Sequence, residues 1–73
     1  MKLKLKDKVV FVTPPGYAGF SDNLLICVIT DIYTDGMLKI KTLTKNEDGF
    51  YIKFTVPESS VRRLTKVEKV LYE

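Results

Sequence analysis

Residues 37–57 read MLKIKTLTKNEDGFYIKFTVP, two runs in which apolar and polar residues alternate on either side of a short loop that ends in glycine. Alternation with a period of two is typical of strands that bury one face. Closing the hairpin around residues 45–49 sets three pairs opposite one another on that face: Thr42–Ile52, Ile40–Phe54 and Leu38–Val56. The stretch therefore predicts an antiparallel hairpin with strands at 37–44 and 50–56.

A second hairpin precedes this one, because a run rich in Ile, Val and Thr at 24–33 leads into Asp35 and Gly36. A two-residue loop would set Asp31 against Ile40 on the buried face, which is costly. A three-residue loop with Gly36 in a left-handed conformation pairs Asp31 with Lys39 on the outside, and we expect this register. The predicted core is then Ile26, Val28, Ile32, Leu38, Ile40, Ile52, Phe54 and Val56.

Two shorter strands, at 8–13 and 61–65, complete a single domain over residues 1–73, and Pro57 to Ser60 suits a turn of 3₁₀ helix before the last strand. The same registers line up an apolar row and a pair of facing lysines on the outer face: Cys27–Leu43–Tyr51, and Ile29–Lys41–Lys53. The tail at 66–73 carries an apolar stripe at helical spacing: Val67, Val70 and Leu71. We expect this stripe to cover the apolar row, the alternative being a partner that docks there.

Three segments carry a resemblance to a known fold. LKDKVV at 5–10, the long loop at 13–23 and VPESSVRRL at 56–64 resemble the opening strand, first loop and closing strand of SH3-like barrels, the superfold of Tudor, KOW and bacterial SH3-like domains. The resemblance covers nearly the whole chain and implies an all-β, five-stranded SH3-like barrel with a short helical tail. It indicates no specific family, and a superfold does not by itself imply a function. In the SH3 domains that this fold resembles, the groove for proline-rich peptides contains a tryptophan. This chain has no tryptophan, so recognition of proline-rich peptides is not expected.

The residues for catalysis are largely missing. The chain has no histidine and a single cysteine, Cys27, so neither a Ser–His or Cys–His pair nor a zinc site can be assembled. The carboxylates are scattered over turns and strand ends, where no pair with a tuned pKa is expected. We expect a protein without enzymatic activity, metal or cofactor. The first apolar run is too short for a signal peptide or a membrane span, which favours the cytoplasm.

Positive charge is concentrated in one half of the chain. Residues 39–66 hold seven of the twelve lysines and arginines against three acids, whereas the whole chain has a net charge of +3. The predicted nucleic-acid-binding surface consists of Lys39, Lys41, Tyr51, Lys53 and Arg62. Cations with interleaved aromatic rings on a sheet can follow a phosphate backbone and stack bases. The partner would be nucleic acid or a protein that handles it, although lysines on strands also serve only to keep sheet edges from aggregating.

The alternative function is a protein-interaction adaptor, and the composition and small size would suit an accessory protein of a bacterium or bacteriophage. Its contacts would be Tyr17 and Phe20, two large rings on the loop at 13–23. Both rings would equally suit a second role, in which they fold back and cap an open end of the barrel. The first lysines of the chain form either a flexible arm that attracts anions or a strand edge: Lys2, Lys4, Lys6 and Lys8.

Overall fold

The computed structural model describes residues 3–14, 16–21 and 23–72, so Lys2 of the predicted arm, Pro15 and Asp22 of the long loop and Glu73 of the tail lie outside the described residues. Within these ranges the elements are β1 (Lys8–Val12), η1 (Tyr17–Gly19), β2 (Leu24–Ile32), β3 (Met37–Thr42), β4 (Lys53–Pro57), η2 (Glu58–Ser60), β5 (Val61–Arg63) and α1 (Lys66–Tyr72). All the predicted strands, the 3₁₀ turn before the last strand and the helical tail are confirmed, with ends shifted by one to three residues.

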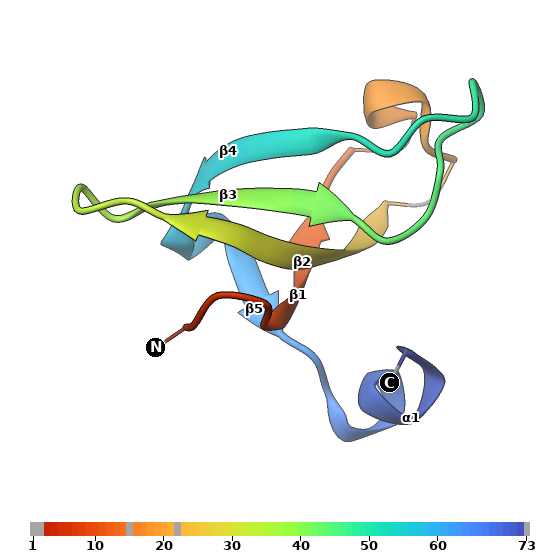
Figure 1. The fold of residues 1–73 in the computed structure, drawn as a ribbon. Helices are drawn as coiled ribbons and strands as arrows, with labels where there is room; N and C mark the ends of the chain where they lie inside the picture. Colours follow the sequence, from red (N-terminus) through yellow and green to blue (C-terminus); the bar gives the residue numbers. More distant parts are fainter. Residues whose placement is uncertain (1–2, 15, 22, 73) are drawn as a thin grey trace.

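The strands form one antiparallel sheet in the order β4-β3-β2-β1-β5. Figure 1 shows β2, β3 and β4 side by side, with β1 and β5 continuing the sheet beneath them. The ladders of the described residues end at β4 on one side and β5 on the other, so the sheet is not closed. The fold is a small all-β domain with five antiparallel strands and one short helix, which is compatible with the SH3-like pattern.

The predicted β3–β4 register is confirmed, and the predicted β2–β3 register is confirmed for the pairs next to the loop. In the β3–β4 ladder Leu38 is paired with Val56 and Ile40 with Phe54. In the β2–β3 ladder Asp31 is paired with Lys39, and Gly36 adopts the left-handed conformation (φ +85°) that the three-residue loop requires. These registers fix which side chains of β3 and β4 face the core.

A β-bulge in β2 reverses the predicted faces of that strand. The register shifts between Ile29 and Asp31, so Thr30 is an extra residue without a partner on β3. Because side chains alternate, one extra residue moves all the preceding ones to the opposite face. Ile29 and Cys27 are therefore buried in the main core rather than exposed, and the predicted outer rows through them are wrong. Val28 takes the place opposite Lys41 that was predicted for Ile29.

The remaining errors in the predicted core have the same origin or lie at a sheet end. Val28 is only half-buried, and Ile26 is buried in a second, smaller cluster with Val10 and Leu64 instead of in the main core. Ile32 is paired with Leu38 as predicted but lies at the end of β2, where it is 45% exposed. The main core draws on every strand and on the long loop: Val9, Phe20, Leu25, Cys27, Ile29, Leu38, Ile40, Val56 and Val61.

The tail forms the predicted helix but does not cover the sheet. Val67, Val70 and Leu71 are 70%, 82% and 69% exposed, so the expected packing of this stripe is wrong. The apolar row that it was to cover does not exist, because Cys27 faces the core. Figure 1 shows α1 beyond the end of β5. No helix in the described ranges is long and apolar enough to cross a membrane.

Two loops far apart in sequence are joined at one end of the sheet. Asn46 Nδ2 donates a hydrogen bond to the carbonyl of Ala18 at 2.9 Å, and the Glu47 amide donates to the Gly19 carbonyl at 2.8 Å. Asn46 Oδ1 also accepts hydrogen bonds from the amides of Asp48 and Phe50, both at 3.0 Å. The loop after β3 is thereby held as a turn through Phe50, and β4 begins at Lys53 rather than at residue 50.

Candidate nucleic-acid interface

A row of side chains crosses the outer face of four strands. Lys53 is paired with Lys41, Lys41 with Val28, and Val28 with Lys8, so the four share one face. The neighbouring residues Val9, Cys27 and Thr42 are buried on the other face, which places this row outside. We call Lys8, Lys41 and Lys53 the basic row. The facing of Lys41 and Lys53 is confirmed, and Lys8 is a member that the sequence did not reveal, since its place depends on the bulge.

Tyr51 precedes Lys53 by two residues, and two ammonium groups approach its ring. The Lys41 Nζ atom is 5.2 Å from the centroid of the Tyr51 ring, and the Lys45 Nζ atom is 5.6 Å from it. Both distances are within the range of cation–π attraction. Tyr51 itself is half exposed. The predicted grouping of Tyr51 with the lysines is therefore present, and Lys45 joins it from the loop that Asn46 organises.

Lys39 shares the outer face but has a different electrostatic environment. Its cross-strand partners are Asp31 on β2 and Thr55 on β4, as the registers predicted. The carboxylate of Asp31 offsets part of its charge, so Lys39 adds less to the field of the face than Lys41 or Lys53. The surface that a ligand would meet is thus most positive around the facing pair.

Arg62 is separated from the other predicted site residues. It is paired with Val10 on β1, which places it on the outer face but three strands away from Lys41. Its guanidinium donates to both carboxylate oxygens of Glu68, at 2.8 and 3.0 Å. The hydrogen bond to Glu68 raises the pKa of Arg62 above its ordinary value. Arg62 therefore holds the start of α1, a role that was not predictable from the sequence because its partner is on the tail.

The same contacts organise the helix terminus around Glu68. The Thr65 amide donates to Glu68 Oε1 at 2.8 Å, and the Glu68 amide donates to the Thr65 hydroxyl at 3.2 Å, which is the reciprocal arrangement of a capping box. Hydrogen bonds from Arg62 and from the Thr65 amide lower the pKa of Glu68 to about 2. Glu68 is thus ionised at neutral pH, and α1 has a fixed starting point on β5.

The loop residues proposed as protein contacts differ in accessibility. Phe20 is 5% exposed and belongs to the main core, so in this conformation its ring fills the interior rather than offering a contact. Tyr17 is 45% exposed and stacks on Phe54, with ring centroids 5.7 Å apart, while its edge approaches Phe11 at 6.4 Å. Of the two rings, Phe20 folds back into the interior, as the capping role expects. Tyr17 is the one of the two that is exposed enough to contact a partner.

Other reactive groups of the described residues are few. Burial raises the pKa of the Cys27 thiol to about 12, so it is a thiol rather than a thiolate at neutral pH. Among the residues in the described ranges, no three His, Cys, Asp or Glu side chains are grouped closely enough to hold a metal ion.

Comparison with known proteins gives no relative, since no protein-family model, no curated protein and no solved structure matches the chain.

Proposed function

We propose that this chain is a non-enzymatic module of the SH3-like barrel kind that binds nucleic acid through its outer sheet face. The observation that carries the proposal is the direct pairing of Lys41 with Lys53, next to a half-exposed Tyr51 flanked by two ammonium groups. Like charges that face each other across two strands destabilise the sheet. A phosphate lying between them would remove this repulsion, so ligand binding has a source of free energy built into the ladder.

The spacing of the basic row suits an extended anion. Neighbouring strands are about 4.8 Å apart, so Lys8, two strands beyond Lys41, lies roughly 10 Å further along the face. A backbone crossing the strands would meet the facing lysines first and Lys8 next. Tyr51 supplies a ring on which a base can stack, and such stacking tolerates any base. We therefore favour single-stranded nucleic acid and little sequence preference.

The test is fluorescence anisotropy of labelled single- and double-stranded oligonucleotides, titrated with the protein at low and then physiological salt. The double variant Lys41→Glu/Lys53→Glu should abolish binding, because two like charges would then repel the phosphates. The matched control is Lys4→Glu/Lys66→Glu, which brings the net charge from +3 to the same −1 at exposed positions off the basic row. Retained affinity in the first variant, or equal loss in both, would overturn a specific role for this face.

A second candidate function rests on Tyr17. Its ring stacks on Phe54 and makes an edge-to-face contact with Phe11, and a ring held in this way yet partly exposed is a favourable anchor for a protein partner. The same titration separates the two candidates. Tyr17→Ser should leave oligonucleotide affinity unchanged if the sheet face binds, and an adaptor would bind no oligonucleotide even at low salt.

A further inference from the structure

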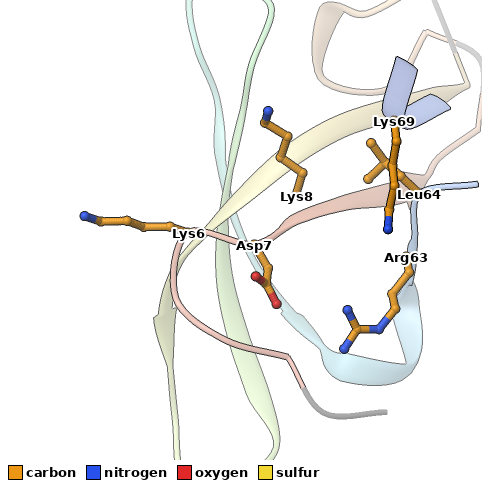
Figure 2. Close-up of a pocket in the computed structure, with 6 residues that line it drawn as sticks. All are labelled: Lys6, Asp7, Lys8, Arg63, Leu64 and Lys69. Carbon is orange, nitrogen blue, oxygen red and sulfur yellow. The ribbon is translucent and has the colours of Figure 1, made fainter. Parts of the chain in front are cut away.

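A second basic feature lies at the opposite edge of the sheet from β4. A pocket of about 240 Å³ is formed where the segment before β1, the end of β5 and the helix α1 meet. It is lined by Lys6, Asp7, Lys8, Arg63, Leu64 and Lys69. Figure 2 shows Lys69 and Arg63 on one side of the pocket, Asp7 and Lys8 across from them, and Lys6 extending outward at the rim. The basic residues thus come from three separate segments.

The lining carries as much net charge as the entire chain. Four cations and one carboxylate sum to +3, and the net charge of the whole protein is also +3. The described lining residues are thus a second concentration of positive charge, beside the one around Lys41 and Lys53. Ion pairs within the pocket would not change the sum. A concave surface with a strong net positive charge attracts anions and focuses the field on them.

The backbone around the pocket is held in a fixed and partly strained conformation. Lys6 has a left-handed backbone (φ +70°), which is uncommon for a residue other than glycine. It is kept there because its amide donates to the Ile29 carbonyl at 2.8 Å and the Ile29 amide donates to the Asp7 carbonyl at 2.9 Å. Strained residues that surrounding contacts enforce are concentrated at ligand-binding sites.

The helical side of the pocket is equally fixed. Lys69 lies on α1, and its amide donates to the Thr65 carbonyl at 2.9 Å. The start of this helix is anchored by the capping box and by the hydrogen bonds between Arg62 and Glu68. A seven-residue helix is too short to be stable by itself, so these contacts are what keep Lys69 beside the pocket.

We propose that this pocket binds a phosphate group. Phosphate suits a small concavity lined by lysine and arginine side chains, because it accepts several charge-assisted hydrogen bonds. Lys8 belongs both to the pocket and to the basic row, so the row leads from Lys53 directly to the pocket. The phosphate is then the terminal phosphate of a bound strand, a source that rests on the proposed function. Free inorganic phosphate is the other source of the same group.

The first test uses inorganic phosphate alone. Titration at constant ionic strength, followed by amide ¹H–¹⁵N spectra, should shift the signals of Lys8, Arg63 and Lys69 in a saturable way. Lys69→Gln should weaken this binding about tenfold, the loss of one charge-assisted contact. Lys66→Gln is the matched control on the same helix and should not weaken it. Shifts that do not saturate, or that are equal in both variants, would overturn the phosphate site, and the spectra report directly whether each variant is folded.

The second test identifies the source of the phosphate. Anisotropy titrations compare one single-stranded oligonucleotide with and without a 5′-phosphate. The phosphorylated strand should bind about tenfold more tightly to the natural protein, and Lys69→Gln should remove that difference. Equal affinities together with saturable phosphate binding would assign the site to free phosphate and overturn the strand-end assignment. Oligonucleotide binding without any phosphate binding would overturn the pocket alone, whereas Lys41→Glu/Lys53→Glu tests the proposed function separately, since neither residue lines the pocket.

Discussion

Lys41 on β3 and Lys53 on β4 are direct partners in the antiparallel ladder, on the outer face of the sheet. Side chains in such positions have Cβ atoms about 5 Å apart, and the two ammonium groups repel each other. The ring of Tyr51 attracts Lys41 and relieves part of this repulsion. If an anion binds between the two lysines, as proposed, the pair lowers the stability of the free protein and strengthens binding.

Replacing Lys53 by threonine should therefore stabilise the free protein while weakening oligonucleotide binding. We expect a gain of up to about 1 kcal/mol in the free energy of unfolding, because the repulsion disappears and threonine suits a strand. Urea unfolding measures the first effect and anisotropy the second. The matched control is Lys39→Thr on the same face, whose partner is Asp31, and it should give no gain in stability. If Lys53→Thr changed neither quantity, the pair would have no role in binding.

The parts of the fold that local chemistry determines were predictable. The β3–β4 register and the β2–β3 pairs next to the loop follow from short loops and from the cost of burying Asp31, and these pairs are correct. The bulge at Thr30 was not predictable, because no glycine or proline marks it. The structure shows what accommodates it: the Thr30 hydroxyl donates to the Lys39 carbonyl at 3.2 Å. Threonine is equally common in a regular strand, so this signal is visible only once the register is known.

The candidate site was predictable to the same extent. The facing lysines and Tyr51 lie on one hairpin, so their grouping followed from its register alone. Arg62 was grouped with them by charge, but its position depends on strand order and its partner lies on the tail. The pocket at Lys8 and Lys69 joins both ends of the chain, a long-range relationship for which a single sequence offers no local pattern.

Acidification should release α1 before the sheet unfolds. The pKa of Glu68 is about 2 in the folded protein, below the ordinary value of 4.5 expected after unfolding. A depressed pKa contributes stability above the unfolded value, and this contribution is lost as the pH falls from about 4.5 towards 2. Amide spectra recorded over this range should show the signals of residues 66–71 change while those of β2 and β3 persist. Glu68→Gln should show the altered helix signals already at neutral pH, and a helix unaffected in that variant would contradict the assignment.

The contact of Asn46 with the loop at 13–23 should make alanine more costly at Gly19 than at Gly16. Both Gly16 and Gly19 are left-handed, at φ +80° and +81°, so alanine at either position costs about 1 kcal/mol. A Cβ at Gly19 would also come within 3.1 Å of Asn46 Nδ2, whereas a Cβ at Gly16 has nothing within 4 Å. We expect Gly19→Ala to destabilise the protein more than Gly16→Ala in urea unfolding. Equal losses of stability in the two variants would mean that Asn46 moves away from the new Cβ at no energetic cost.

The Cys27 thiol should resist modification while the protein is folded. Burial leaves it fully enclosed and raises its pKa to about 12, and only the thiolate reacts with alkylating agents. At pH 8, iodoacetamide should label the native protein far more slowly than the urea-unfolded chain, with mass spectrometry as the measurement. Labelling of the folded protein requires an opening of the structure around Cys27. Its rate should therefore increase when low concentrations of urea are added. Labelling at the rate of the unfolded chain would contradict the burial of this strand face, and with it the bulge at Thr30.

The exposed stripe of α1 should contribute nothing to the stability of the isolated domain. Val67, Val70 and Leu71 have most of their surface in solvent, so little apolar area is removed from water when the chain folds. The triple variant Val67→Gln/Val70→Gln/Leu71→Gln should keep the urea midpoint of the natural protein, whereas Leu64→Gln should lower it, because Leu64 is buried with Val10 and Ile26. Glutamine is a good helix former, so the triple change leaves the helix itself intact. A clear loss of stability in the triple variant would mean that the stripe packs on the sheet. The helix would then lie elsewhere, and Lys69 would not line the pocket described above.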